Sequence, residues 1–414
     1  MSRTALAAIG IVAAVTLAGC SEASVPMPTP TPLPTYAVTG DGVLRIGTLF
    51  ASTGPYGASQ VAGVEAAVRE INEAGGINGV PVEVFHRNSG DATTETAEAA
   101  YADLVAKGAD VVIGPTSSDL AERLVEPIIE AGVPLISPSA TSPSLTALDD
   151  AGLVFRTVGD YAAQGPVLAE ALAEAGATKV AYISLDDENG TALLESLTAA
   201  VEEEGLTLAY AGSVKAGATS FSSVISKAKA AKPSAVVLAT PAEASDTTIA
   251  LIAALTAASL GGAKLWLTSQ NLADYSQLLA AGVLDQANGV LEGAQPDEAL
   301  AARLKQADPG LGTTRYAAEA YDATMLAALA AVQAGDDGGP AIARLLPTVS
   351  AKGIPCTSFG QCLDVLSTEP DIDYNGVSGP VGLTAEGDVT TASWTVYAYT
   401  AGNVFAPVRT VISG

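Results

Sequence analysis

The sequence contains little of the chemistry that most enzymes need. Its 414 residues include one histidine, His86, and only three cysteines. A Ser–His or Cys–His nucleophile, or a metal site built from several histidines, therefore has almost no residues to draw on. The glycine-rich motifs that hold phosphates and the G-x-S-x-G motif of many serine hydrolases are also missing. We expect a binding protein and no enzyme, with no cofactor and no metal ion.

Basic and aromatic residues are also scarce. The chain has 19 Lys and Arg residues against 45 Asp and Glu residues, a net charge of −26. Such a surface repels phosphate backbones, so we expect no nucleic acid among its partners. Aromatic residues make up 5% and hydrophobic residues 49%, so the core consists mostly of Ala, Val, Leu and Ile. The length predicts two or three domains.

The chain has no apolar run that is long enough to cross a membrane. Residues 5–18 form an apolar run of 14 residues, whereas a spanning helix needs roughly 20. The run therefore predicts a signal peptide over residues 1–19. Its last letters, LAGC, resemble the lipobox of bacterial lipoproteins. The resemblance implies that Cys20 is lipidated and that this lipid anchors the exported chain to the outer face of the cytoplasmic membrane. The alternative is an ordinary export signal beside an incidental cysteine.

Residues 20–42 contain the lipidation site and then a segment rich in proline and threonine. Prolines alternate with other residues from position 26 to position 34. Such a segment forms neither a helix nor a central strand and favours an extended polyproline conformation. It predicts a tether between the membrane and a folded body.

The two remaining cysteines, Cys356 and Cys362, lie six positions apart near the C-terminus. An exported chain meets oxidising conditions, so we expect the two to form a structural disulfide. The alternative, a metal or redox role, lacks the CxxC spacing and further ligands.

From residue 43 onward, short β-rich runs alternate with Ala-rich segments of helical periodicity. Nine runs predict strands: 43–50, 80–88, 109–114, 133–137, 153–158, 179–185, 206–214, 235–240 and 264–269. Strand–helix alternation predicts parallel sheets with right-handed crossovers. Nine strand–helix units are more than a single sheet usually contains. We therefore expect two α/β lobes, with crossings near 156–164 and 371–383. The last residues predict an antiparallel pair that turns at 401–403.

Ligands of such sheets bind beyond the carboxyl ends of the strands. The loop in residues 113–124 enters a helix with Ser117 or Ser118 as the N-cap, and the loop in 136–148 does so with Ser142 followed by Pro143. Hydroxyl and free N–H groups at a helix start favour a carboxylate or another anionic group. The alternative is that these residues only cap their helices.

Six strings together resemble the leucine/isoleucine/valine-binding family of solute receptors: IGTLFASTGPYG, INEAGGINGVPVEV, VVIGPTSSD, PLISPSATSPSLT, FRTVGDYAAQGP and AAEAYDATMLAALA. The ending CTSFGQC…DIDYNGVSGP resembles the variant common among actinobacterial members. The resemblance implies the type I periplasmic-binding-protein fold, with two doubly wound parallel-sheet lobes joined by a multi-strand hinge. It implies lobes of 43–160 plus about 292–378, and of about 161–291 plus 379–414.

The family resemblance also implies a ligand site. Carried over motif by motif, Tyr56 would lie against the solute and Tyr316 would line the pocket. Ser118, the carbonyl of Ser139 and Thr141 would hold the carboxylate and ammonium groups of an amino acid.

Two positions depart from the family pattern. Amino-acid binders of this family place an acid after the strand that corresponds to 264–269, but this chain has Gln270 there. An amide offers an ammonium no compensating charge, and a buried charge without a partner is costly. Where relatives often present a tyrosine, this chain has Asn189 at the end of the acidic string 186–189. Either an acid of that string supplies the charge, or the ligand is not a simple α-amino acid.

The resulting hypothesis is a monomeric, lipid-anchored binding protein for a small polar solute, such as a neutral or branched-chain amino acid. It would deliver the solute to the permease of an ABC importer. The alternatives are a sensory lipoprotein coupled to a membrane signalling protein, a binder of short amides or carboxylates, and a secreted hydrolase.

Overall fold

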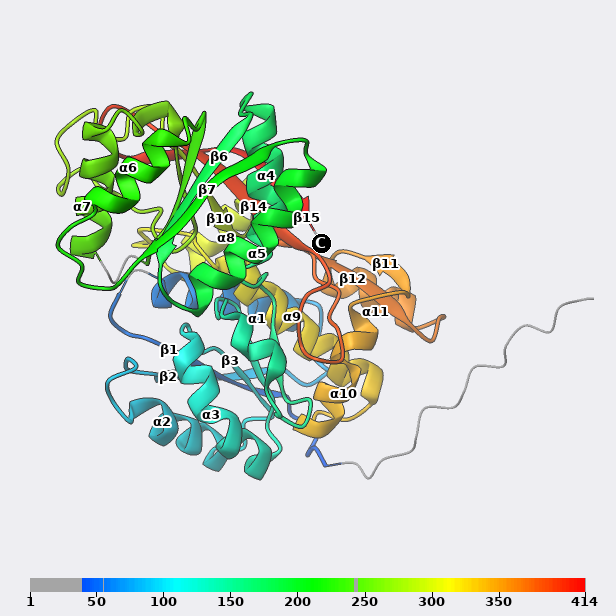
Figure 1. Cartoon of the computed structure of the whole chain (residues 1–414). Coiled ribbons are helices and arrows are strands. Elements are labelled where there is room, and N and C mark those ends of the chain that lie inside the picture. Colours follow the sequence, from blue (N-terminus) through cyan, green and yellow to red (C-terminus); the bar gives the residue numbers. More distant parts are fainter. Residues whose placement is uncertain (1–38, 55, 242–244, 414) are drawn as a thin grey trace, which may run out of the picture. The chain divides into compact units, whose positions relative to one another are not determined.

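The computed structural model describes residues 39–54, 56–241 and 245–413 (Figure 1). The predicted signal peptide, Cys20 and most of the predicted tether lie outside these residues. The chain divides into two units, Met1–Ala37 and Val38–Gly414, and the account below concerns the second. Within the described residues, no helix is both long enough and apolar enough to cross a membrane.

The first large sheet has five parallel strands in the order β2-β1-β3-β4-β5. The strands are β1 (Arg45–Phe50), β2 (Glu83–Asn88), β3 (Val111–Ile113), β4 (Leu135–Ser137) and β5 (Val154–Arg156). The helices of this region are α1 (Gly57–Glu73), α2 (Thr96–Ala106), α3 (Ser118–Ala131), η1 (Pro143–Ala147), α8 (Glu298–Ala307), α9 (Ala317–Ala334) and α10 (Gly339–Val349). Helix α9 is almost wholly buried and packs on α1, α10 and β3, so it lies at the centre of this core.

The second large sheet has seven strands in the order β15-β14-β10-β9-β8-β6-β7. Five are parallel: β6 (Lys179–Leu185), β7 (Thr207–Val214), β8 (Ala235–Ala239), β9 (Leu265–Leu267) and β10 (Asn288–Glu292). The antiparallel hairpin of β14 (Ala392–Tyr399) and β15 (Phe405–Ser413) completes the sheet. The helices α4 (Gln164–Glu174), α5 (Glu188–Glu203), α6 (Ser222–Ala230) and α7 (Ser245–Ala257) belong to this region, with the short η3 (Gly262–Lys264) before β9. Separate apolar clusters cover the two faces of the sheet.

All nine predicted strands and the terminal antiparallel pair are confirmed. The α/β fold has two lobes, and three connections join the two large sheets. These are the links from β5 to α4, from β10 to α8, and from the C-terminal part of the first lobe into β14. The three links form the hinge of the fold.

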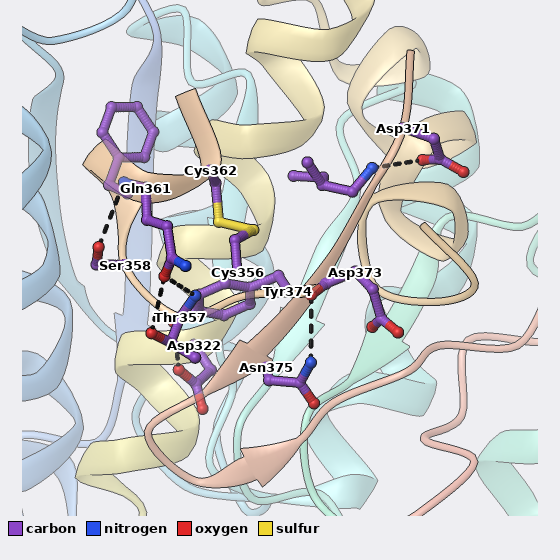
Figure 2. The surroundings of a disulfide bond; sticks show 12 residues. Asp322, Cys356, Thr357, Ser358, Gln361, Cys362, Asp371, Asp373, Tyr374 and Asn375 are labelled. Carbon is purple, nitrogen blue, oxygen red and sulfur yellow. Dashed lines mark hydrogen bonds between the residues drawn. A yellow bond between two sulfur atoms is a disulfide. The ribbon is translucent and has the colours of Figure 1, made fainter. Parts of the chain in front are cut away.

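A small third sheet carries the disulfide. It consists of β11 (Ile354–Cys356), β12 (Ile372–Gly376) and β13 (Gly379–Pro380), with helix α11 (Phe359–Leu366) beside it. The predicted bond between Cys356 and Cys362 is present, with an S–S distance of 2.07 Å, and it ties β11 to α11 (Figure 2).

The segment expected only as a crossing near 371–383 contains the strands β12 and β13 instead. The physical reason is its alternating burial. Ile372 and Tyr374 are fully buried while their neighbours are half-buried, the period of two that suits a strand. The Tyr374 hydroxyl donates a hydrogen bond to Oδ1 of the buried Asp322 on α9, at 2.8 Å (Figure 2).

Candidate functional site

A cavity of about 580 Å³ lies where residues from both lobes meet. One side comes from the first lobe and contributes Tyr56, residues 312–316 and Glu319. The other side comes from the ends of β9 and β10 and from the β14–β15 hairpin, and contributes residues 272–274, 291–295, Tyr397, Val404, Phe405 and Pro407. The volume lies in the range of pockets for small molecules.

Arg315 occupies the middle of this cavity wall. Its guanidinium carbon lies 4.8 Å from the ring centre of Tyr56 and 4.7 Å from that of Tyr316, so two aromatic faces enclose the cation. Nη1 donates to the Tyr56 hydroxyl at 2.9 Å, and Nη2 donates to the Tyr316 hydroxyl at 2.8 Å. Nη2 also contacts Oε2 of Glu292 at 3.1 Å and the carbonyl of Ser269 at 3.4 Å. Arg315 thus links helix α1, the start of α9 and the ends of β9 and β10.

Tyr316 owes its position to an unusual backbone conformation. It caps the start of α9 with a φ of 62°, in the left-handed region that non-glycine residues seldom adopt. Such a conformation costs on the order of 1–3 kcal/mol and persists only where the surroundings hold it. Here its ring meets that of Tyr56 edge-on at 5.4 Å, and its hydroxyl donates to Oε2 of Glu292 at 3.3 Å. Burial raises the pKa of the Tyr316 phenol, so the hydroxyl remains a donor.

Glu319 is a buried acid of this cavity with one carboxyl oxygen that lacks a hydrogen-bond partner. Its residue is 2% exposed, and its Oε1 has no partner among the described residues. Burial raises the pKa of its carboxyl group to about 8. The nearby Asp322 and Glu292 also raise this pKa, whereas Arg315 lowers it. We call Glu292, Arg315, Tyr316 and Glu319 the charged cluster.

A second polar group follows β3 and β4 in the first lobe. Gln60 of α1 donates through Nε2 to the Ser139 hydroxyl at 2.6 Å and accepts from the Thr116 hydroxyl at 2.7 Å. Ser139 in turn donates to the Thr116 carbonyl at 3.0 Å, and the Ser118 hydroxyl accepts from the backbone N–H of Ser142 at 3.0 Å. We call Gln60, Thr116, Ser118 and Ser139 the hydroxyl cluster. Gln60, Thr116 and Ser139 bond one another, and Ser118 bonds the backbone of Ser142.

The structure separates the residues that the sequence singled out. Tyr56 and Tyr316 lie together in the cavity wall. Ser118 is the first residue of α3, and Ser139 and Thr141 belong to the loop after β4; all three lie outside that wall. The carbonyl of Thr141 accepts a hydrogen bond from the backbone N–H of Tyr161 at 2.7 Å.

The two departures from the family pattern also lie outside the cavity wall. Gln270 is half-buried and follows the last residue of β9, Leu267, by three positions. Asn189 is the second residue of α5, and its Oδ1 is buried without a partner among the described residues. Ligand contacts at these positions, as at Ser118, Ser139 and Thr141, remain predictions.

Sequence reasoning missed Arg315, Glu292 and Glu319. A signal was present for each, because charged residues interrupt otherwise apolar strings in NGVLEG and RYAAEAYDAT. The N-cap prediction at Ser142 is confirmed, since its hydroxyl accepts from the N–H of Ser144. Ser117 is the N-cap residue of α3, but its side chain makes no capping hydrogen bond.

Comparison with known proteins agrees with this architecture. A family model described as "Periplasmic binding protein" matches residues 43–403. The chain belongs to this family of extracytoplasmic solute-binding proteins.

Individual relatives match over different lengths. The leucine-, isoleucine-, valine-, threonine- and alanine-binding protein of Pseudomonas aeruginosa is 32% identical over 201 residues, which cover 47% of this chain and 53% of that protein. The Leu/Ile/Val-binding protein homolog 3 of Brucella melitensis gives a similar match, so the chain spans about half the length of these relatives. A chemotactic signal transduction system substrate-binding protein of Halobacterium salinarum is 28% identical and is covered over 84% of its length, with 83% of this chain.

Solved structures share the fold. The ABC transporter substrate-binding protein of Desulfitobacterium hafniense in complex with Leu superposes with a TM-score of 0.67 at 21% identity, covering 88% of this chain and 100% of that one. A solute-binding protein of an ABC transporter from Rhodopseudomonas palustris, in complex with p-hydroxybenzoic acid, gives a TM-score of 0.65 at 17% identity, with 90% and 97% covered. At these identities the likeness establishes the fold alone.

Proposed function

We propose that this chain is the solute-binding lipoprotein of an ABC importer. It captures a small polar solute, a neutral or branched-chain amino acid or a related compound, between two lobes and hands it to the permease. The lobes of this proposal span residues 43–160 with about 292–378, and about 161–291 with 379–414. The solute favours the closed arrangement because it contacts both lobes at once, and no bond is made or broken.

The cavity that both lobes line is the observation that supports this function most strongly. Its walls carry aromatic rings, a guanidinium and carboxyl groups, which together suit a small solute with polar and apolar parts. Membership of the periplasmic binding protein family and the names of the amino-acid-binding relatives support the same substrate class.

The proposal also covers the cellular setting. Cys20 carries the lipid that holds the protein at the outer face of the cytoplasmic membrane, and the protein works as a monomer without catalytic activity. A sensory lipoprotein is the second candidate, because the relative with a chemotaxis name matches over most of its length. Deleting the gene and measuring solute uptake separates the two. Lost uptake supports the importer, and unchanged uptake with a lost behavioural or transcriptional response supports the sensor.

The direct test is a thermal-shift screen of the purified full chain carrying Cys20→Ala, so that no lipid is attached. Amino acids, short amides and carboxylates, aromatic acids included, are added at rising concentration. A solute at 100 times its dissociation constant adds about 2.7 kcal/mol to the free energy of unfolding. A shift with amino acids supports the proposed substrate class, and a shift only with carboxylates or amides redirects it. If no small solute shifts the transition, the binding function itself is wrong.

A further inference from the structure

The charges around the cavity leave one buried carboxyl group without a counterion. Three acidic residues line the cavity, Asp274, Glu292 and Glu319, against one basic residue, Arg315. Glu292 is paired with Arg315, and the exposed Asp274 accepts from the N–H of Ser276 at 2.8 Å. Glu319 is the acid that remains, and a cationic ligand group would complement it.

The surroundings of Glu319 keep its carboxyl group close to the cavity wall. The side chain lies against the end of β10, where a Cβ atom added to Gly293 would come within 2.4 Å of Oε1. Glycine at 293, with a φ of 93°, therefore makes room for this carboxyl group. The backbone carbonyl of Glu319 accepts from the Thr157 hydroxyl at 2.8 Å, which holds this turn of α9 against the first hinge connection.

A buried carboxyl group without a hydrogen-bond partner costs free energy, and an apolar residue of similar size would avoid that cost. Its presence in the wall of a cavity therefore calls for a donor, which a ligand can supply.

The position of Glu319 also bears on Gln270, which stands where the family resemblance implies an acid. Strands β9 and β10 are parallel neighbours, so their carboxyl ends meet at the same edge of the sheet. Gln270 follows β9, whereas Glu292 ends β10 and Gly293 touches Glu319. The carboxyl group of Glu319 therefore lies beside the end of β10, one strand away from position 270 after β9.

The remaining walls suit the apolar part of an amine. Arg315 already covers the faces of Tyr56 and Tyr316, but Tyr397 and Phe405 form a further edge-on pair with ring centres 5.2 Å apart. Aromatic rings attract an ammonium through their faces and also pack against aliphatic or aromatic groups.

We propose that the solute carries an ammonium group and that Glu319 is its charge partner, in place of the acid that position 270 lacks. This inference rests on the proposed solute-binding function and narrows it to primary amines and amino acids. The groups that face Glu319 are Asp322 of its own helix, Glu292 of β10, Arg315 before α9 and Tyr397 of β14.

Binding of the ammonium then ionises a carboxyl group that is protonated in the free protein at pH 7, since its pKa lies at about 8. Close to one proton is therefore released for each solute bound at pH 7. The affinity rises close to tenfold from pH 6 to pH 7 and levels off above pH 8.

The test uses two matched sets of probes and the full chain with Cys20→Ala. The first set is L-leucine, 3-methylbutylamine and 4-methylpentanoate, and the second is L-phenylalanine, 2-phenylethylamine and 3-phenylpropanoate. Calorimetric titration in two buffers of different ionisation enthalpy gives the affinity and the protons released. We expect at least one probe with an ammonium to bind, and its deaminated counterpart to bind at least tenfold more weakly.

Glu319→Gln and Glu130→Gln provide the matched pair of variants, since Glu130 is exposed on α3 and lies outside the cavity wall. Glu319→Gln lowers the affinity for the ammonium probes at least tenfold and abolishes proton release, and Glu130→Gln changes neither. Equal binding of the deaminated acids, with affinity unchanged in Glu319→Gln, overturns the inference and leaves the solute-binding function standing. If none of the six probes binds, the inference and the amino-acid part of the proposed function are both wrong.

Discussion

The hydroxyl cluster and the charged cluster lie on the same protein but use their polar groups differently. In the hydroxyl cluster, Gln60, Thr116 and Ser139 donate to and accept from one another. In the charged cluster, Arg315 and Glu292 form an ion pair, but Nε of Arg315 and Oε1 of Glu319 have no partner among the described residues. Neutral hydroxyl and amide groups exchange partners at little cost, whereas a buried carboxyl without a partner is expensive. The unpartnered carboxyl oxygen of Glu319 is therefore a stronger indication of a ligand than the internally bonded hydroxyl cluster.

The largest expected effect comes from removing the cation of the charged cluster. Arg315→Met leaves the Glu292 carboxylate, whose side chain is 2% exposed, without its counterion. We expect the free energy of unfolding to fall by about 3–5 kcal/mol, measured by urea denaturation. Arg409→Met is the control, because the pairs of Arg409 with Glu170 and Glu174 are far more exposed and contribute at most about 1 kcal/mol. Equal losses in the two variants would mean that the buried Arg315–Glu292 pair contributes no more to stability than an exposed ion pair.

The pH dependence of stability tests the ionisation of Glu319. The folded chain holds this proton up to a pKa of about 8, whereas the unfolded chain loses it above the ordinary value of 4.5. Between these values unfolding releases the proton, so the free energy of unfolding falls by about 1.4 kcal/mol for each unit by which the pH rises. Glu319→Gln removes this loss. The stability of the variant relative to the wild type should therefore grow from pH 5 to pH 8, and a constant difference would refute the raised pKa.

A carboxylate at position 270 should be able to replace that of Glu319 in part. The double variant Glu319→Gln/Gln270→Glu places a carboxylate after β9, where the family resemblance implies an acid. We expect it to recover about tenfold in affinity for an ammonium probe relative to Glu319→Gln alone, or about 1.4 kcal/mol. Calorimetric titration measures this, with Gln270→Asn in the Glu319→Gln background as the uncharged control. Equal affinity of the two double variants would place the ammonium away from the ends of β9 and β10.

The smallest effect is expected in the hydroxyl cluster. Ser139→Ala removes the hydrogen bonds to Gln60 and to the Thr116 carbonyl, so thermal unfolding should show a loss of about 1 kcal/mol. Solute affinity should change little, because the role predicted for Ser139 uses its backbone carbonyl, which alanine retains. Ser223→Ala, an exposed position on α6, serves as the control. A large loss of affinity without a loss of stability would show that the Ser139 hydroxyl itself contacts the solute.

Much of the fold was predictable because its signals are local. The nine parallel strands, the terminal hairpin and the Cys356–Cys362 bond follow from alternating apolar runs, turn residues and cysteine spacing. The strands β10, β11, β12 and β13 were missed. Strand β10 is short and ends in a charged residue, Glu292, and β12 lies in a string of Asp, Asn and Gly that is typical of a turn.

The candidate site was predictable only in part. Tyr56 and Tyr316 were found through motifs, and they do meet in the cavity wall. Arg315, Glu292 and Glu319 could not be identified as a group, because β10 and the start of α9 meet α1 only after the chain has crossed between the lobes.

The sequence by itself determined the α/β class, the two sheets, the disulfide and the scarcity of catalytic groups, since composition and periodicity act over neighbouring residues. The tertiary structure alone decided which charges share a cavity. A guanidinium at 315 reaches a carboxylate at 292 and a phenol at 56 because the ends of α1, β10 and α9 converge there. An oxygen of the carboxyl group at 319 is left without a partner for the same reason, since the residues that bury it come from distant parts of the chain and none of the described donors bonds it.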